Sequence, residues 1–313
     1  MGPGLRTDMT ELAVYTTAYP GVEPYLADWY RSVLSQSDRD FRLWIGVDSI
    51  TVDAVEATVG SIPEAVWVQA TPMSTPAQVR QQAIGQMVET CDAVVFVDSD
   101  DVLCPTRVAS ARAQLAESDL TGCALQLIDE KGVDLGLTFG LPEITRPEEV
   151  LPRNNVFGLS NTAFRSDLLR ACLPIPSDTL AVDWFLATRA WLRGASMSFG
   201  NHIEMLYRQH PSNTVRTTGP FDAEQVARDT ERVRRHFELV REAGLEDGLT
   251  ERVSALQEVA GDVELFQERI VSDCSLLEEY VSRLNSLHIA PLWWSSVANP
   301  ALQTMWSQPE EKR

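Results

Sequence analysis

The stretch Ala93-Val94-Val95-Phe96-Val97-Asp98-Ser99-Asp100-Asp101 joins a short apolar run to three closely spaced carboxylates. A continuous run of this kind, rich in β-branched residues, is typical of a strand buried on both faces of a parallel sheet. The acids come at the carboxyl end of this strand, where open α/β sheets bind their ligands. Crowded carboxylates repel one another unless a cation lies among them, and their hard oxygen atoms suit Mg²⁺ or Mn²⁺. The stretch therefore predicts a metal-binding strand end, with a solvated acidic turn as the alternative.

The composition limits the classes of protein to which the chain can belong. Its 313 residues suit one large catalytic domain with an appendage, and 44% hydrophobic residues suffice for a substantial core. With 45 acidic and 26 basic residues the net charge is −19. Such a charge argues against a general nucleic-acid binder and against a protein of anionic membrane surfaces. We therefore expect no nucleic-acid partner.

The cysteines and the apolar segments indicate the compartment. Five scattered cysteines without CxxC spacing are typical of free thiols in a reducing cytosol. No run of about eighteen apolar residues occurs, and the N-terminus lacks the apolar core of a signal peptide, so we expect no transmembrane segment. Residues 1–8 read as a leader or an added remnant, with Met9 as the natural start. The expected location is cytoplasmic, with the inner membrane face as the place of any peripheral contact.

The first hundred residues alternate between strand and helix patterns. Strands are expected at residues 12–17, 41–47, 65–69 and 94–97. Helices between them, one of which is capped by Thr75-Pro76, make right-handed crossovers and hence a mostly parallel sheet. The strand ends then bring Thr17, Asp48 and the acids Asp98 and Asp100 to one rim.

Three later stretches are rich in polar groups. Residues 153–161 combine amides, an aromatic ring and glycine, which suits a polar binding loop. Asp183 opens a helix after a proline-rich loop. An acid at that position is usually only a partner of the helix macrodipole, but this one stands among tryptophans. Residues 206–213 are dense in hydrogen-bond donors.

The composition changes after residue 216, where we place a domain boundary. Residues 256–284 carry apolar side chains at alternating spacings of three and four, which is typical of long helix–helix packing. We expect residues 217–313 to be a helical assembly or docking region that takes no part in chemistry. A homodimer through these helices is the first expected arrangement, and packing within the chain is the second. Membrane contact through Trp293 and Trp294 is a weaker alternative, because the helices are acidic.

Six elements in order resemble a known family. They are TTAYPG (16–21), the strand that ends at Asp48, the helix with Arg80, VDSDD (97–101), VDWFLATR (182–189) and YRQHPSN (207–213). Together they are similar to the inverting family 2 glycosyltransferases of the GT-A fold, over residues 12–213. The resemblance implies an α/β fold in residues 9–216, a GT-A Rossmann-like mostly parallel sheet flanked by helices, followed by the C-terminal α-helical region.

The resemblance also implies an activity and its partners. A metal-dependent inverting enzyme of this family moves a sugar from a nucleotide-diphosphate donor to a hydroxyl group, and UDP-sugars are the favoured donors here. The acceptor would be a glycan or a lipid-linked molecule, in bacterial surface polysaccharide or glycoconjugate synthesis. The cofactor would be Mn²⁺ or Mg²⁺, since an in-line displacement needs charge stabilisation on the departing diphosphate.

Each residue that matches the family has an implied role. The nucleotide-binding residues would be Thr17, Ala18, Asp48, Arg80, Asp98 and Ser99. The metal ligand would be Asp100, with His210 near the metal or the diphosphate. The catalytic base on the acceptor hydroxyl would be Asp183. The residues that contact the acceptor or the donor sugar would be Asn154, Asn155, Gly158, Trp184 and Arg208, although Trp184 is also compatible with a place in the core.

Two departures from the family pattern affect these roles. The second strand ends in Gly46-Val47-Asp48-Ser49, with one acid where the family usually has two, which leaves the nucleobase open. The usual Glu-Asp pair before the catalytic helix is Val182-Asp183 here. The absence of a like-charged neighbour is expected to lower the pKa of the base.

Two other functions fit parts of the sequence. Asp98-Ser99-Asp100-Asp101-Val102 also fits the DxDx(T/V) motif of haloacid-dehalogenase-type phosphatases, in which Asp98 would be the nucleophile. That motif normally follows the first strand, whereas here it follows the fourth. A non-catalytic nucleotide- or glycan-binding scaffold is the second alternative. Hydrolysis of a sugar-nucleotide donor in the presence of metal separates the three functions.

Overall fold

The computed structural model describes residues 11–307 except 63, 70, 72, 143–144, 211–212, 214–218 and 289–291. The expected leader (1–8) and the boundary expected near residue 216 lie outside the described residues. The elements of the first half are β1 (Leu12–Ala18), α1 (Glu23–Leu34), β2 (Arg42–Val47), α2 (Val52–Val59), β3 (Val66–Gln69), α3 (Pro76–Thr90), β4 (Ala93–Phe96), β5 (Val102–Leu103), α4 (Arg107–Leu115), β6 (Leu120–Ile128) and β7 (Asp134–Phe139). Those of the second half are α5 (Pro147–Val150), β8 (Thr162–Arg165), α6 (Ser166–Cys172), α7 (Val182–Leu192), β9 (Met197–Arg208), α8 (Ala223–Glu242), α9 (Thr250–Phe266), the π-helical η1 (Gln267–Val271), α10 (Cys274–Ser286), the 3₁₀ turn η2 (Pro300–Leu302) and α11 (Thr304–Ser307).

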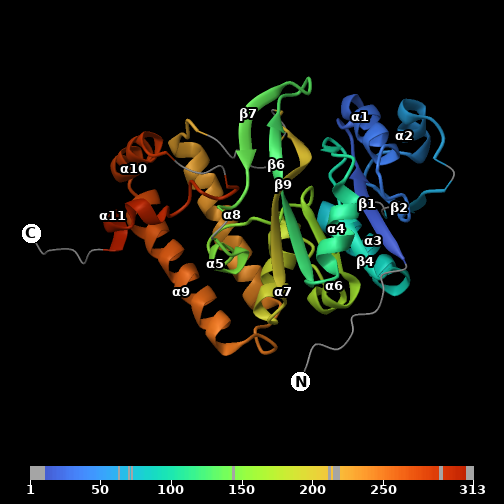
Figure 1. Cartoon of the computed structure of the whole chain (residues 1–313). Coiled ribbons are helices and arrows are strands. Elements are labelled where there is room, and N and C mark those ends of the chain that lie inside the picture. The colour runs from blue at the N-terminus through green and yellow to red at the C-terminus, as the bar shows by residue number, and fades with distance from the viewer. Residues whose placement is uncertain are drawn as a thin grey trace, which may run out of the picture.

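One sheet runs through the molecule in the order β3-β2-β1-β4-β8-β6-β9-β5, and β7 pairs with β6 beside this row (Figure 1). The pairs among β1, β2, β3 and β4 are all parallel, as expected for strands joined by helical crossovers. β8 runs antiparallel to β4 and to β6, whereas β6 and β9 are parallel. The expected fold class, an α/β sheet flanked by helices with a helical C-terminal region, is confirmed. The mostly parallel arrangement holds for the first four strands, and the complete sheet is mixed.

Parallel pairing brings the carboxyl ends of β1, β2 and β4 to the same edge of the sheet. Two hydrogen bonds tie these ends together. The buried Ser99 hydroxyl donates to the Thr17 carbonyl at 2.7 Å, and the Asp48 amide donates to the Ala18 carbonyl at 2.9 Å. The polar side chains that follow the three strands therefore share one rim, as their sequence positions predicted.

Helix α3 begins at a capping box and carries a cation to this rim. The Gln78 amide donates to Thr75 Oγ1 at 3.3 Å, and the Thr75 amide donates to Gln78 Oε1 at 2.8 Å. Pro76 occupies the first turn, where its missing N–H is not needed. The apolar face of α3 packs on β2 and β3. Arg80 follows one turn into the helix and lies at the edge where the strand ends meet.

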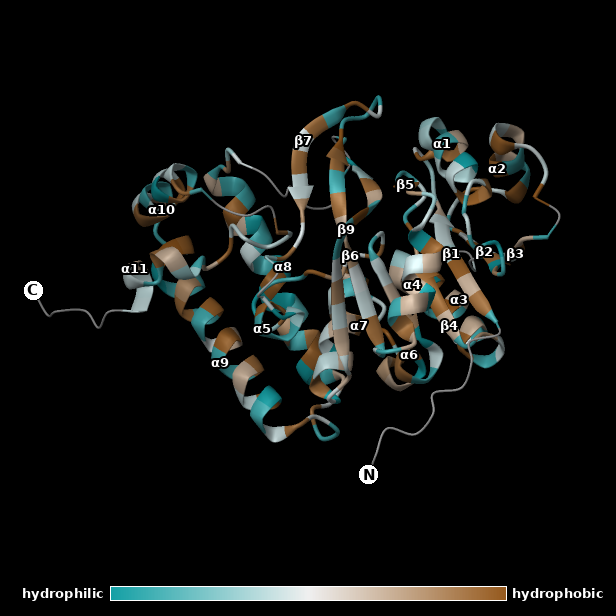
Figure 2. Ribbon diagram, in the orientation of Figure 1, coloured by the Kyte–Doolittle hydropathy of each residue, from teal (hydrophilic) through white to brown (hydrophobic). Residues whose placement is uncertain are grey.

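The C-terminal helices pack on the sheet domain and on one another. α8 contacts α7, and α9 contacts α8 on the side of the molecule opposite α1 and α2 (Figure 1). Hydrophobic residues recur along α8, α9 and α10 between hydrophilic ones (Figure 2). The buried members of the apolar stripe are Leu256, Val263, Phe266, Ile270, Leu277 and Leu284, and they belong to the same hydrophobic cluster as the sheet. The stripe therefore has its partner surface within the chain, which was the second of the two expected arrangements.

The cysteines and helices bear on the expected compartment. All five cysteines are free thiols, and three of them are buried. In the part of the chain that the structure describes, no helix has the length and apolar character needed to cross a membrane.

Replacing Phe266 by alanine tests the intramolecular packing of the stripe. The Phe266 ring is fully buried, with its centroid 4.7 Å from that of Tyr280 and 5.1 Å from that of Trp306. We expect Phe266→Ala to lower the free energy of unfolding by about 3–5 kcal/mol, because it leaves a cavity in a packed core. Its control is Leu265→Ala, at a neighbouring position of α9 that is 39% exposed, and it should change stability by no more than about 0.5 kcal/mol.

Urea unfolding at several protein concentrations measures both losses. A loss at Leu265 equal to that at Phe266, or a midpoint that rises with protein concentration, would contradict packing within one chain and favour a dimer interface.

Candidate active site

A cavity of about 330 Å³ lies at the rim where the strand ends meet. Elements far apart in the sequence enclose it: the ends of β1, β2, β4 and β9, the first turns of α3 and α7, and the segment after α10. The predicted site residues that line it are Thr17, Asp48, Arg80, Asp98, Asp100, Asn155, Asp183 and His210. The structure thus brings together residues that were predicted from the sequence to bind the nucleotide, to bind the metal and to take a proton.

Asp100 and His210 meet at this cavity. His210 Nε2 lies 2.9 Å from Asp100 Oδ2, and the Tyr19 hydroxyl donates to the same oxygen at 3.2 Å. Two further contacts hold His210 in place. Its ring stacks on Tyr25 at a centroid distance of 5.2 Å, and its backbone amide donates to Asn213 Oδ1. A carboxylate and an imidazole are therefore within reach of one ligand.

Arg208 does not reach the cavity, contrary to its predicted contact with a sugar. Its side chain is 1% exposed, and its Nε donates to the Asp100 carbonyl at 2.8 Å. Its Nη2 donates to Asp28 Oδ2 of α1 at 3.2 Å, and its backbone amide donates to Asp101 Oδ1 at 2.7 Å. Arg208 is fully engaged in these hydrogen bonds, and through them it holds the loop after β4 in place.

Asp98, which is half-buried, and the fully buried Asp101 share one hydroxyl donor. The Ser160 hydroxyl lies 3.2 Å from Asp98 Oδ2 and also bonds Asp101 Oδ2. Burial, reinforced by the charge of Asp100, raises the pKa of Asp98 to about 7, and it raises the pKa of Asp101 as well. This rim therefore resists carrying all of its negative charges at neutral pH unless a cation joins them.

Among the described residues, Arg80 is the one guanidinium that lines the cavity. Its charge lowers the pKa of both Asp98 and Asp183, although burial outweighs it in each case. Its buried Nε has no hydrogen-bond partner among the described residues. Four carboxylates, those of Asp48, Asp98, Asp100 and Asp183, line the same cavity. The cavity is thus acidic, and an anionic ligand needs further positive charge to enter it.

Asp183 lies in the first turn of α7 with its carboxylate at the cavity. The Asn155 side-chain amide donates to Asp183 Oδ2 at 2.9 Å and holds the carboxylate in place. Burial raises the pKa of Asp183 to about 6. The missing acidic neighbour removes one influence that would raise this pKa further, but desolvation is enough to raise it above the ordinary value of an aspartate. A carboxyl with this pKa is suited to accept a proton near neutral pH.

Five other predicted site residues lie behind the cavity wall. Ala18 and Ser99 are fully buried and join the strand ends. Asn154 Oδ1 accepts a hydrogen bond from the Trp294 amide at 3.1 Å. Trp184 is fully buried, donates from Nε1 to the Leu151 carbonyl, and stacks on His236 at a centroid distance of 3.8 Å. Trp184 therefore has the core place that the sequence left open, and its contact with a sugar is contradicted.

Gly158 is needed for close packing and does not line the cavity either. A Cβ at this position would lie 2.6 Å from Trp293 Cη2 and 2.7 Å from Cζ2. The ring of Trp293 is further packed on Phe139, at a centroid distance of 4.0 Å, and its Nε1 donates to the Tyr207 hydroxyl at 3.4 Å. Glycine lets this indole settle against residues 153–161.

The aromatic part of the wall was not predicted from the sequence. Trp293 and Trp294 line the cavity together with Tyr19 and Tyr207. The region after residue 216 therefore contributes two side chains to the cavity wall, which the expectation of an assembly or docking region did not include. Tyr19 had a signal in its place within TTAYPG, two residues after Thr17. The two tryptophans had none, because they lie far along the chain from the rest of the lining, whose nearest member is Asn213.

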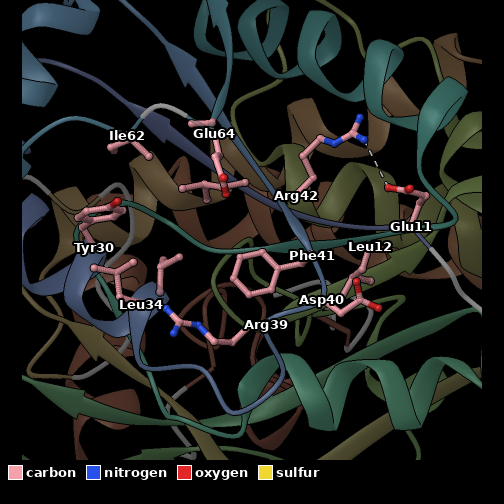
Figure 3. A pocket seen from close by; sticks show the side chains of 13 residues that line it. Glu11, Leu12, Tyr30, Leu34, Arg39, Asp40, Phe41, Arg42, Ile62 and Glu64 are labelled. Atoms are coloured by element: carbon pink, nitrogen blue, oxygen red, sulfur yellow. Dashed lines mark ion pairs between the residues drawn. The ribbon is translucent and has the colours of Figure 1, made fainter.

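A larger cavity of about 560 Å³ lies elsewhere, at the amino ends of β1 and β2 (Figure 3). Its walls carry the ion pair of Glu11 and Arg42, whose charged atoms are 3.6 Å apart, and the ring of Phe41. None of the predicted site residues lines it. Among the described residues, no three His, Cys, Asp or Glu side chains are grouped as a complete metal site.

Two solved structures share this fold. S. aureus TarS 1–349 in complex with UDP-GlcNAc matches with a TM-score of 0.52 and 17% identity, over 88% of this chain and 90% of that chain. The mannosyltransferase PcManGT from Pyrobaculum calidifontis, in complex with GDP-Man and Mn²⁺, matches with a TM-score of 0.51 and 16% identity, over 95% of this chain and 88% of that one. No protein-family model and no curated protein sequence matches the chain. The likeness establishes a common fold over nearly the whole chain, including the C-terminal helices.

Replacing Gly158 by alanine tests the packing of the tryptophan wall. We expect Gly158→Ala to lower the free energy of unfolding by about 1–3 kcal/mol, because its methyl group displaces the Trp293 ring. The matched control is Gly261→Ala in α9, where a Cβ meets nothing within 4 Å, and it should stabilise the protein by about 0.5–1 kcal/mol. Urea unfolding gives the stabilities, and near-ultraviolet circular dichroism reports the indole. Changes of the same sign in both variants would show that Trp293 does not press on Gly158.

Proposed function

We propose that the chain is a metal-dependent glycosyltransferase that moves a sugar from a nucleoside-diphosphate donor to a hydroxyl group of an acceptor. The observation that carries the proposal is one cavity in which Asp98 and Asp100, at the end of β4, face Arg80 and a separately held carboxylate, Asp183. The shared fold supports it, because TarS was crystallised with UDP-GlcNAc and the mannosyltransferase with GDP-Man. The function rests on the site, since a fold alone does not define an activity.

The charge of the cavity is the reason to include a divalent cation. A diphosphate is itself anionic, so it binds among these carboxylates only if positive charge accompanies it. Asp100 and His210 offer an oxygen and a nitrogen ligand, and magnesium or manganese sites of this kind take their remaining ligands from substrate phosphates and water. The donor set thus fits Mn²⁺ or Mg²⁺. When bound, the ion offsets the charge on the departing diphosphate.

The two ends of the cavity divide the chemistry. The residues proposed to bind the nucleotide of the donor are Thr17, Asp48, Arg80 and Asp98. UDP is the nucleotide that we favour. Asp183 is proposed to take the proton from the acceptor hydroxyl as its oxygen attacks the anomeric carbon, while the bond from that carbon to the diphosphate breaks. A single displacement of this kind inverts the anomeric centre, in agreement with the family 2 resemblance.

The wider role follows the same resemblance. We propose a glycan or lipid-linked acceptor in bacterial surface polysaccharide or glycoconjugate synthesis, at a cytoplasmic location. Residues 9–216 would carry the donor site and residues 217–313 would complete its wall. A homodimer is also proposed. The apolar stripe does not support it, because its apolar residues are buried within the chain.

The two alternative functions have less support. The phosphatase motif normally follows the first strand, whereas Asp98 follows β4. A non-catalytic scaffold would have no use for a carboxylate such as Asp183, held by Asn155 beside the cavity. The shared fold also supports sugar transfer.

We predict that UDP binds more tightly in the presence of Mn²⁺. Calorimetry should show an affinity at least about tenfold higher with Mn²⁺ than with a chelator, because the cation offsets the acids. Asp100→Ala should abolish this difference, whereas Asp53→Ala, on the exposed side of α2, should preserve it. Equal affinities with Mn²⁺ and with chelator in the unaltered protein would show that Asp100 has no part in metal binding.

We predict that Asp183→Asn lowers kcat by about 10² or more while UDP binding persists, because an amide keeps the shape but cannot take the proton. The matched control is Asp167→Asn, another acid in the first turn of a helix, α6, which should leave kcat unchanged. Comparable losses in both variants would reduce Asp183 to a partner of the helix macrodipole.

The same base predicts a pH dependence. The ionised form of Asp183 is the active one, and its pKa is raised to about 6, so kcat should fall as the pH drops through 6 and level off above it. The acidic limb should disappear in the residual activity of Asp183→Asn. A pH profile measured from pH 5 to 8 that is flat in the unaltered enzyme would exclude this base.

A further inference from the structure

A second pocket, of about 230 Å³, adjoins the active-site cavity. Leu180, Ala181 and Trp294 line both, so they form a common wall. Beyond that wall the second pocket lies between the loop that precedes α7 and one face of α8. None of the residues proposed to bind nucleotide or metal lines it.

We propose that this second pocket binds the acceptor, and that its ligand is a neutral hexopyranose, the unit next to the one that presents the reacting hydroxyl. The inference rests on the proposed glycosyltransferase function and adds the class of acceptor, a neutral glycan of at least two sugar units.

The position of the pocket relative to the base is the first reason. Ala181 is the N-cap residue of α7, two residues before Asp183. Trp294 is tied to the same place, because its amide donates to Asn154 and the next residue, Asn155, holds the Asp183 carboxylate. The two spaces therefore join at the end of the cavity where the acceptor hydroxyl must lie.

The rigidity of the shared wall is the second reason. The Trp184 ring stacks on His236 of α8 on one side and on Trp294, at a centroid distance of 5.7 Å, on the other. Burial lowers the pKa of His236 to about 3, so this imidazole is neutral and adds no charge to the pocket. The wall is preorganised, which limits the entropy lost when a ligand binds.

The chemistry of the lining is the third reason. Leu180, which is 53% exposed, joins Leu239 and Trp294 in an apolar surface that suits the C–H face of a pyranose. The Thr179 hydroxyl, buried at the edge, has no hydrogen-bond partner in the described part of the chain. Such a group can bond a sugar hydroxyl.

Charge and size select a neutral ring. Arg235 pairs with Asp178 at 2.6 Å, and Arg232 pairs with Asp229 at 3.3 Å, so the arginines of the pocket are compensated and do not call for an anionic ligand. Pockets that enclose drug-sized ligands measure about 300–1,000 Å³. The second pocket is smaller, so it suits a single ring and is too small for an isoprenoid chain.

Filling the pocket from its rim tests the proposal. Glu231 lies on α8, is exposed, and lines the second pocket but not the active-site cavity. Glu231→Trp places an indole at the pocket mouth. The control, Glu224→Trp, makes the same exchange at an exposed position two turns earlier on α8, outside the pocket. Thermal unfolding confirms that both variants are folded.

The measurement is calorimetry with UDP and Mn²⁺ present. The ligands are the methyl glycosides of glucose, galactose, mannose and N-acetylglucosamine, and the disaccharides built from each. At least one disaccharide should bind about tenfold more tightly than its monosaccharide. Glu231→Trp should abolish this advantage while UDP still binds, and Glu224→Trp should keep it.

Each other outcome has a definite meaning. If UDP binds but no disaccharide exceeds its monosaccharide, or if the advantage survives Glu231→Trp, the second pocket is not an acceptor subsite. If UDP itself fails to bind with Mn²⁺, the proposed glycosyltransferase function fails first, and the two failures are thereby distinguished.

Discussion

Repulsion among the carboxylates after β4 is the constraint on which the rest of the site depends. Three carboxylates follow the buried strand within four residues, those of Asp98, Asp100 and Asp101. Burial raises the pKa of Asp98 and that of Asp101. The fold offsets part of this repulsion with donors from distant elements, namely the hydroxyl of Ser160 on Asp98 and Asp101 and the backbone amide of Arg208 on Asp101. What it does not offset is the acidic surface that faces the cavity, and this remaining charge is what attracts a cation.

Burial acts on Asp183 in a different way. Its position is set by a hydrogen bond from the side-chain amide of Asn155, in the loop before β8. Desolvation raises its pKa to about 6, which leaves it ionised at neutral pH and still basic enough to accept a proton. One cavity thus holds an acidic cluster and, apart from it, the carboxylate of Asp183, and the proposed displacement with a charged leaving group uses both.

The C-terminal helices change the character of the site. Their apolar stripe is buried within the chain, and the segment after α10 carries Trp293 and Trp294 to the cavity. Gly158 and Asn154 receive these two residues, one by leaving room for a ring and the other by accepting a backbone hydrogen bond. The strand ends of the sheet form the part of the cavity around Asp98 and Asp100, while the wall near Asp183 includes residues of the helical region.

The sequence by itself determined the features that local chemistry controls. Strand β4, its acids, the capping box at Thr75 and the parallel order of the first four strands follow from apolar runs, turn residues and crossovers. Only the tertiary structure decided which polar residues are used for support and which face the cavity. Arg208 and Trp184 were predicted from the sequence to contact a sugar, yet both side chains are buried. Their partners lie in α1 and α8, far away in the chain. Burial and pKa depend on such distant contacts, which no local pattern encodes.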